Sequence, residues 1–170
     1  MAKIIMITGG QRSGKSELAE KTALRLSATP LYVATAVITD EEMARRIESH
    51  RCRRGSQWRL AEEKLWPSRC IVAGDTALID CITVWSTNML FHFSEDADKA
   101  LKAIIQELDT IAAIENATIV AVTNEIGLGG ISPNPLQRKF TDLQGLVNRH
   151  MADIASEVYL TISGIPVKIK

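Results

Sequence analysis

The apolar residues of this chain fall into short continuous runs, separated by longer segments in which they recur at helical intervals. A continuous aliphatic run of this kind is typical of a strand that is buried on both faces of a parallel sheet. The runs that predict strands are residues 3–8, 31–36, 77–82, 118–123 and 158–162.

Between the predicted strands, apolar side chains return every three or four positions, which indicates helices that pack one face against a sheet. In the first such segment, for example, Leu18, Ala23 and Leu26 lie on one side. Asp40 precedes the second segment and suits the N-cap of a helix. The predicted helices are residues 16–26, 40–51, 136–156 and a long one that begins at Ser94 or Asp96 and runs to Ile114.

Strands that alternate with helices predict an α/β fold with a mainly parallel sheet. Ser163 and Gly164 can turn the chain into residues 165–169, which predicts a short antiparallel hairpin at one edge of that sheet. No internal repeat or linker interrupts the pattern, and 170 residues suffice to build one core. We therefore expect one domain that spans residues 1–170.

The charges of the chain balance, with 20 Lys and Arg residues against 20 Asp and Glu residues. Domains that bind nucleic acid are usually basic, so this balance argues against such a partner, although arginines crowd between Arg45 and Arg59. No apolar run approaches the roughly 20 residues of a membrane span, and no signal-peptide pattern is evident. We expect a cytoplasmic protein whose cysteines, Cys52, Cys70 and Cys81, are reduced thiols.

The segment GGQRSGKS, residues 9–16, matches the phosphate-binding pattern G-x-x-x-x-G-K-[ST], and a predicted strand and helix flank it. Glycines allow backbone N–H groups to surround a phosphate, and the N-terminus of the helix adds a favourable dipole. We expect Lys15 to reach the β- and γ-phosphates and to act in catalysis, and the Ser16 hydroxyl to bind Mg²⁺. The nucleotide-binding residues predicted here are Gly9, Gly10, Gln11, Arg12, Ser13, Gly14, Lys15 and Ser16.

Two acidic side chains come at the ends of predicted strands. Asp80 ends the apolar run that begins at Ala77, and Glu125 follows the strand at residues 118–123. The carboxyl ends of parallel strands line the ligand crevice of such sheets, where an acid can bind the magnesium ion of a nucleotide. Ser16, Asp80 and Glu125 are therefore the predicted metal ligands. The residues alone leave open that Asp80 caps its strand and that Glu125 orients a hydroxyl.

His50 is the candidate nucleophile, because a helix that continued over residues 40–54 would place it on one face with Arg46 and with Arg53 or Arg54. Positive neighbours lower the pKa of an imidazole and keep it neutral and nucleophilic, and arginines also hold phosphate oxygens. The residues alone favour an exposed histidine on a basic helix over a nucleophile. His150 has no evident acidic partner in the sequence.

Several motifs follow one another along almost the whole chain. They are TGGQRSGKS at residues 8–16, YVATA at 32–36, RIESHR at 46–51, Trp58 with Glu62, DCITVW at 80–85 with Asn88, VTNEIG at 122–127, then Phe140, Asp142, Gly145 and Asn148, and SGIPVKIK at 163–170. The P-loop alone is not specific, but the ordered set resembles the bifunctional adenosylcobinamide kinase/adenosylcobinamide-phosphate guanylyltransferase family of cobalamin biosynthesis.

The resemblance implies a RecA-like P-loop NTPase fold in three layers, a homo-oligomer that we expect to be a trimer, and two reactions. In the first, ATP or GTP phosphorylates the aminopropanol hydroxyl of adenosylcobinamide, a corrinoid. In the second, GTP guanylylates His50 with release of pyrophosphate, and GMP then passes to adenosylcobinamide phosphate to give adenosylcobinamide-GDP. The resemblance also implies nucleotide contacts at Ala34, Thr35, Ala36, Arg51, Cys52, Arg53, Arg54, Glu62 and Asp80.

Some positions depart from the pattern of the family. Thr141 and Arg149 stand where arginine and glutamine are common, and these changes bear on the corrinoid-contacting surface rather than on the GTP chemistry. Two other functions also fit the P-loop. One is a small P-loop kinase of another metabolite, in which His50 is incidental and no covalent adduct forms. The other is a non-catalytic module that binds a nucleoside triphosphate and modifies nothing.

Overall fold

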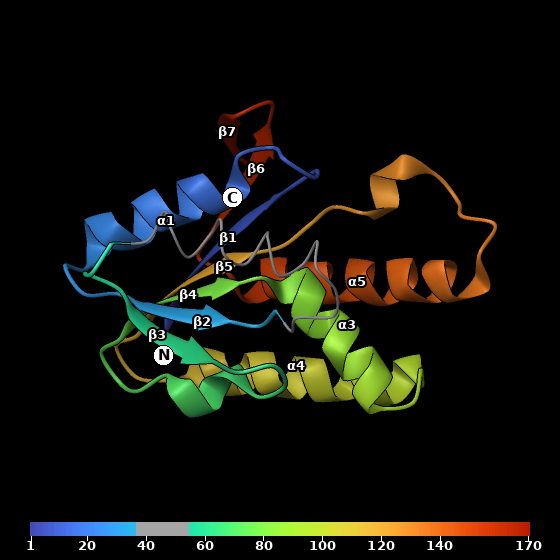
Figure 1. Cartoon of the computed structure of the whole chain (residues 1–170), viewed down its shortest axis with the longest axis horizontal. Helices are drawn as coiled ribbons and strands as arrows, with labels where there is room; N and C mark the ends of the chain where they lie inside the picture. Colours follow the sequence, from blue (N-terminus) through green and yellow to red (C-terminus); the bar gives the residue numbers. More distant parts are fainter. Residues whose placement is uncertain (37–54) are drawn as a thin grey trace.

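The computed structural model describes residues 1–36 and 55–170, and it shows a central sheet with helices packed against it (Figure 1). The strands are β1 (Lys3–Gly9), β2 (Leu31–Ala34), β3 (Arg59–Glu62), β4 (Thr76–Asp80), β5 (Thr118–Val122), β6 (Glu157–Ile162) and β7 (Ile165–Lys168). The helices are α1 (Lys15–Leu26), α3 (Ile82–His92), α4 (Ala97–Ala113) and α5 (Pro135–Ile154), with short 3-10 helices η1 (Pro67–Cys70) and η2 (Gly127–Gly129). The helix predicted at residues 40–51 lies outside the described residues.

Over residues 1–36 and 55–170, the sheet has seven strands in the order β3-β2-β4-β5-β1-β6-β7. Every neighbouring pair is parallel except β6 and β7, which form an antiparallel hairpin at one edge. The predicted α/β fold with a mainly parallel sheet and an antiparallel edge hairpin is therefore confirmed. Apart from the differences described below, the predicted elements that fall within the described residues occur with ends that shift by one or two residues.

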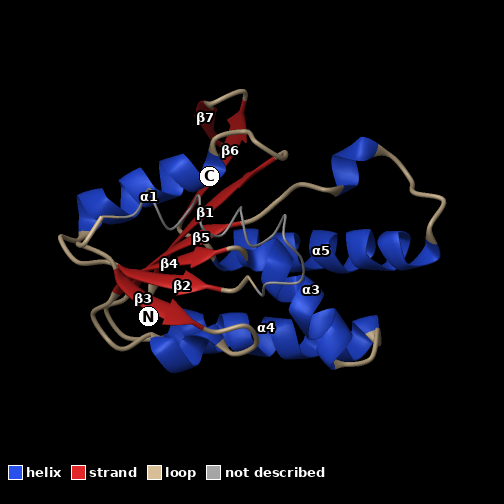
Figure 2. Ribbon diagram, in the orientation of Figure 1, coloured by secondary structure: helices blue, strands red, loops and turns tan. Residues whose placement is uncertain are grey.

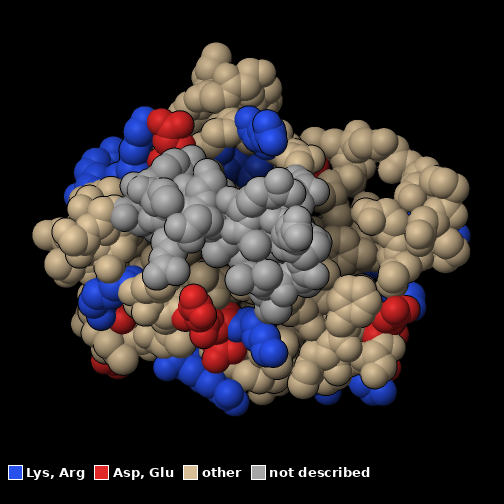
Figure 3. Space-filling model, viewed as in Figure 1, with Lys and Arg blue, Asp and Glu red and all other residues tan. Residues whose placement is uncertain are grey.

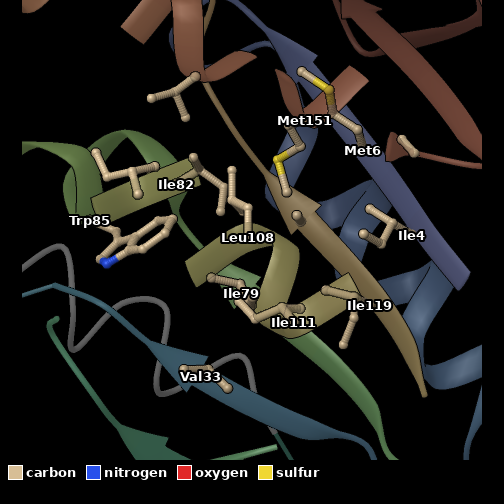
Figure 4. Packing of buried hydrophobic residues seen from close by; sticks show 14 of the residues in the cluster. Ile4, Met6, Val33, Ile79, Ile82, Trp85, Leu108, Ile111, Ile119 and Met151 are labelled. Atoms are coloured by element: carbon tan, nitrogen blue, oxygen red, sulfur yellow. The ribbon is translucent and has the colours of Figure 1, made fainter. Parts of the chain in front are cut away.

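Helices cover both faces of the sheet, which confirms the predicted three layers (Figure 2). On one face, Ala19 of α1 packs in a cluster with Ile7 of β1. The larger cluster on the other face joins α3, α4 and α5 to the sheet, and Trp85, Leu108 and Ile119 belong to it (Figure 4). Each fully buried side chain of this size stabilises the fold by roughly 1.5–3 kcal/mol. These clusters therefore fix the strand ends that carry the site.

The prediction of one strand over residues 77–82 is wrong. β4 ends at Asp80, Cys81 caps the next element, and Ile82 is already the first residue of α3. A helix at this place was also missing from the prediction. Its buried side includes the polar Thr83 and Ser86, whereas the apolar Phe91 is exposed, so the helix shows no single apolar stripe of the kind that periodicity detects. The buried residues of α3 are Ile82, Thr83, Trp85, Ser86, Met89 and Leu90.

β3 was likewise missing from the predicted strands. Among the described strands it lies at the edge of the sheet and pairs with β2 alone. Most of its residues are exposed, including the apolar Leu60, which is 51% exposed. The strand therefore carries no continuous apolar run. An ion pair between Arg59 and the largely buried Asp75 ties its first residue to the loop before β4.

Two further sequence expectations concern single side chains. The view that His150 has no acidic partner is wrong, because Nε2 of His150 lies 2.8 Å from Oδ1 of Asp109 on α4. This partner is distant in sequence and only the packing of α4 against α5 brings it close. The two described cysteines, Cys70 and Cys81, are free thiols, as predicted.

The surface of the described residues carries charges of both signs. On the face in Figure 3, Lys and Arg side chains alternate with Asp and Glu side chains and with uncharged residues. Within residues 1–36 and 55–170, no helix has the length and the apolar composition that crossing a membrane requires.

Candidate functional site

The segment between β1 and α1 forms a loop whose shape depends on two glycines. Gly9 has a φ of 151° and Gly14 a φ of 93°, values that side chains with a Cβ rarely adopt. Gly14 is the N-cap of α1, and the helix begins at Lys15. The free N–H groups of its first turn therefore face the loop, which suits an anion such as a phosphate.

The strands on either side of β1 brace this loop. Beyond β5, the N–H group of Glu125 donates to the carbonyl oxygen of Gly9 at 3.1 Å. In the turn between β6 and β7, the N–H group of Gly164 donates to the carbonyl oxygen of Ser13 at 3.0 Å. The predicted P-loop is thus held by two segments that lie far from it in the sequence.

The Lys15 side chain lies within the loop. Its Nζ donates to the carbonyl oxygen of Gly10 at 2.5 Å and lies 3.5 Å from Oγ of Ser13. Burial lowers the pKa of the Lys15 ammonium, and the nearby Asp80 carboxylate partly opposes this shift. The Lys15 ammonium and the Asp80 carboxylate are therefore close enough to interact beside the loop. The Ser16 hydroxyl, in the first turn of α1, accepts and donates no hydrogen bond among the described residues.

Several predicted site residues align in one row across the sheet. Glu62 is opposite Ala34, Ala34 is opposite Asp80, and Asp80 is opposite Val122 at the end of β5. Val122 is in turn opposite Ile7 of β1, just before the P-loop. The row follows the carboxyl ends of the strands, which is where open α/β sheets bind ligands (Figure 1).

Tyr32 fixes the orientation of Asp80. Its hydroxyl donates to Oδ2 of Asp80 at 2.6 Å, and the rest of the side chain is buried. The Tyr32 ring meets Trp58 edge to face, with ring centroids 5.7 Å apart. A hydrogen bond to a carboxylate from a ring that cannot move holds that carboxylate in place. This role was not predicted from the sequence, because the spacing of apolar residues identifies Tyr32 only as a buried position of a strand.

Thr35 joins the loop after β2 to the loop after β4. Its Oγ1 donates to the carbonyl oxygen of Cys81 and accepts from the Cys81 N–H group, both at 2.9 Å. Its N–H group donates to the carbonyl oxygen of Asp80, and its own carbonyl oxygen accepts from Asn88. The fully buried Thr35 side chain thus fastens the two strand ends together, next to the half-buried Ala36.

Glu125 lies beyond the end of β5, and two donors hold one of its oxygens. The Thr8 hydroxyl donates to Oε1 at 2.9 Å, and Nδ2 of Asn148 donates to the same oxygen at 3.0 Å. Sequence reasoning assigned no role to either donor. Thr8 ends the predicted strand at residues 3–8, and the sequence singles out Asn148 only as one position of the ordered set of motifs.

The donors around the P-loop fit a magnesium ion that arrives with a nucleotide. No group of three or more His, Cys, Asp or Glu side chains gathers as a metal cage in the part of the chain that the structure describes. Mg²⁺ is usually bound by one or two carboxylates together with waters and phosphate oxygens. The Ser16 hydroxyl and the carboxylates of Asp80 and Glu125 are hard oxygen donors of this kind.

The predicted nucleophile and the residues that follow it cannot be placed in this site. His50, Arg51, Cys52, Arg53 and Arg54 lie outside the described residues. The geometry above therefore concerns the P-loop, the strand ends and Glu62, which is exposed at the end of β3.

Among solved structures, the flagellar accessory protein FlaH from Methanocaldococcus jannaschii is similar over 99% of this chain and 78% of its own, with 15% sequence identity and a TM-score of 0.46. The strand order given above, rather than this distant likeness, defines the fold.

The sequence relatives are much closer. The chain is 42% identical to the bifunctional adenosylcobalamin biosynthesis protein CobU of Escherichia coli K12, over 98% of this chain and 99% of that protein. It is 36% identical to the bifunctional adenosylcobalamin biosynthesis protein CobP of Pseudomonas aeruginosa, over 97% of this chain and 96% of that protein. A family model described as cobinamide kinase/cobinamide phosphate guanyltransferase matches residues 5–169. The chain therefore belongs to the cobinamide kinase/cobinamide phosphate guanyltransferase family.

Proposed function

We propose that this chain phosphorylates adenosylcobinamide and then transfers GMP to adenosylcobinamide phosphate through a covalent guanylyl intermediate on His50. The observation that carries the proposal is the arrangement of Lys15, Asp80 and Glu125 around one P-loop, in a chain of this family. The relatives named above are bifunctional proteins of adenosylcobalamin biosynthesis, which supports a corrinoid substrate.

In the proposed kinase reaction, the acceptor hydroxyl attacks the γ-phosphorus of ATP or GTP and its proton passes to water. The bond from the γ-phosphorus to the bridging β-phosphate oxygen breaks, and ADP or GDP leaves. The N–H groups of residues 9–16 and the Lys15 ammonium offset the charge that develops on the phosphates. Ser16, Asp80 and Glu125 hold the Mg²⁺ that accompanies the nucleotide, which supplies further positive charge. Tyr32 keeps the Asp80 carboxylate in one orientation for this task.

In the proposed guanylyl transfer, a neutral ring nitrogen of His50 attacks the α-phosphorus of GTP and pyrophosphate leaves. A phosphate oxygen of the corrinoid then attacks the same phosphorus, the P–N bond breaks, and GMP is transferred. Two displacements replace one difficult transfer, which is the benefit of a covalent intermediate. The residues proposed to contact GTP besides the P-loop are Ala34, Thr35, Ala36, Arg51, Cys52, Arg53, Arg54, Glu62 and Asp80.

Intact-protein mass spectrometry after incubation with GTP, Mg²⁺ and pyrophosphatase tests the covalent step. Wild-type protein is expected to gain the mass of one GMP in an acid-labile form, and His50→Ala protein is expected to gain none. His150→Ala is the matched control, because His150 pairs with Asp109 on α4, outside the predicted site, and should leave the adduct unchanged. A wild-type protein that stays unmodified would contradict the guanylyl-histidine and leave a P-loop kinase.

We also propose a homo-oligomer, with a trimer as the expected form. The cross-strand pairs Ile162–Ile165 and Leu160–Val167 put aliphatic side chains on one face of the β6–β7 hairpin. Ile162, Ile165 and Val167 are 56%, 66% and 46% exposed, and an exposed aliphatic face of this kind is typical of protein contacts. Light scattering is expected to give a trimer mass for the wild type and a smaller mass for Ile165→Asp. A monomeric wild type would refute this proposal.

The compartment is proposed to be the cytoplasm. The free thiols of Cys70 and Cys81 support a reducing environment. Fractionation of cells that express the tagged chain is expected to place it with soluble cytoplasmic markers, and recovery with a periplasmic marker would contradict the proposal.

A further inference from the structure

A buried hydrogen-bonded network joins the end of β5 to α5. The Thr123 hydroxyl donates to Oδ1 of Asn148 at 2.7 Å. Nε2 of Gln144 donates to the same oxygen at 2.8 Å and to the Thr123 hydroxyl at 3.0 Å. Thr123 and Gln144 are fully buried, and Asn148 is 6% exposed. The network therefore lies in the interior, directly behind the strand end that leads to Glu125.

The network fixes the orientation of the Asn148 amide. Its oxygen already receives two donors, so its Nδ2 group must point the other way. The two N–H bonds of Nδ2 reach the carbonyl oxygen of Asn124 at 3.1 Å and Oε1 of Glu125 at 3.0 Å. All of the hydrogen-bonding capacity of the Asn148 side chain is thus used within the protein, and none is left for a substrate.

Oε1 of Glu125 is held just as fully. The buried Thr8 hydroxyl donates to it at 2.9 Å from β1, so this oxygen receives two donors. Oε2 receives no hydrogen bond from the residues that the structure describes. Because the Glu125 N–H group also binds the carbonyl oxygen of Gly9, the carboxylate is fixed beside the P-loop with one oxygen left for a ligand.

Stability alone does not account for this network. Oε1 of Gln144 is buried and has no hydrogen-bond partner among the described residues. A buried oxygen without a partner loses its hydration and gains nothing in return. An apolar side chain of similar size would fill this space at a lower cost. The Gln144 amide therefore indicates a task beyond packing, and its Nε2 group performs one by fixing Oδ1 of Asn148.

We propose that Asn148 is a positioning residue for Glu125. It holds Oε1, so that Oε2 is the oxygen that binds the magnesium–nucleotide complex at the P-loop. This inference rests on the proposed function of Glu125 and goes beyond it by naming the residue that sets its geometry. Because Asn148 acts only through Glu125, its removal has little effect once Glu125 has itself been changed.

A double-mutant cycle with Asn148→Ala and Glu125→Gln tests the inference. The first readout is the Mg²⁺ concentration that half-saturates the binding of a fluorescent GTP analogue, without corrinoid. The second is kcat and KM for corrinoid phosphorylation. We expect Asn148→Ala to raise the half-saturating Mg²⁺ concentration and lower kcat by about ten-fold, with KM for the corrinoid changed by less than about two-fold. In the Glu125→Gln background, the same substitution changes each value by less than about two-fold.

Two further variants keep the test decisive. Asp153→Asn alters an exposed side chain on the same helix and should match the wild type in both readouts. Thr8→Val removes the other donor to Oε1 and replaces Asn148→Ala in the cycle if that protein does not fold. Equal losses from Asn148→Ala in both backgrounds would overturn the inference. A wild type that binds the magnesium–nucleotide but phosphorylates no corrinoid would refute the proposed function, and the binding cycle would still decide the role of Asn148.

Discussion

Gly9 offers the sharpest test of the P-loop geometry. Its φ of 151° is unfavourable for any residue with a Cβ, and a Cβ built there lies 2.4 Å from the carbonyl oxygen of Thr161 and 2.8 Å from Oγ of Ser13. The Ser13 side chain can rotate away, but the Thr161 carbonyl belongs to β6, which is paired with β1 at this position. Gly9→Ala therefore forces β1 and β6 apart where they meet the loop.

The expected destabilisation follows from two contributions. A strained backbone conformation costs roughly 1–3 kcal/mol, and an added methyl group in a packed site costs roughly 1–3 kcal/mol more. Gly9→Ala should thus lower the free energy of unfolding by about 2–6 kcal/mol. At roughly 2–4 °C per kcal/mol for a chain of this size, Tm should fall by at least about 4 °C. Urea unfolding without nucleotide, followed by circular dichroism, measures the change in the free energy of unfolding directly.

Gly10→Ala is the matched control for this prediction. No heavy atom lies within 4 Å of a Cβ built on Gly10, and its φ is not in the left-handed region. The control should therefore change the free energy of unfolding by less than about 1 kcal/mol. If Gly9→Ala and Gly10→Ala proteins unfold at the same urea concentration, the close approach of β1 and β6 at the P-loop is not real.

Two other predictions concern the framework around the site. Trp85 is fully buried and its Nε1 donates to the carbonyl oxygen of Leu65 at 2.8 Å, so Trp85→Phe should lower the free energy of unfolding by about 2–4 kcal/mol in urea titrations. The pKa of Glu157 is lowered to about 2, chiefly by a hydrogen bond from Lys3 and further by hydrogen bonds from Tyr159 and Lys168. Because this pKa is below the ordinary 4.5, the folded state gains stability above about pH 4.5 and loses it as the pH falls toward 2. Glu157→Gln should therefore destabilise the protein near pH 7, and the difference in Tm from wild type should shrink between about pH 5 and pH 3; a constant difference would contradict this.

The fold could be predicted wherever the apolar pattern has one clear period. The aliphatic runs of β1 and β5 are buried on both faces, and α4 presents a single apolar stripe, so each was identified. The prediction failed where the buried positions of an element do not follow the spacing of its apolar residues. α3 follows the apolar run of β4 directly, and it buries the polar Thr83 and Ser86 while Phe91 is exposed. The edge strand β3 is mostly exposed. Neither the helical period of about 3.6 residues nor the strand period of two can be recognised in such a segment.

In the site, the residues that belong to motifs could be predicted, but the side chains that contact them could not. The prediction that Lys15, Asp80 and Glu125 meet at one edge of the sheet follows from a motif and from the rule that strands end on the same side. The side chains that orient these residues could not be found in this way. Tyr32 and Asn148 look like ordinary positions of a strand and a helix, and only the packed structure shows which carboxylate each one contacts.

The strand order explains why a loop of eight residues needs almost the whole chain. A glycine-rich sequence permits the P-loop conformation but does not select it, since glycine also permits many others. Selection comes from β5 and β6, which flank β1 and supply the hydrogen bonds from Glu125 to Gly9 and from Gly164 to Ser13. Both donors follow strands that are parallel to β1 and therefore reach it only through crossover connections, which here contain α4 and α5. The conformation of the predicted phosphate site is therefore a property of the assembled sheet, and substitutions in the β6–β7 turn should weaken nucleotide binding even though that turn lies outside the motif.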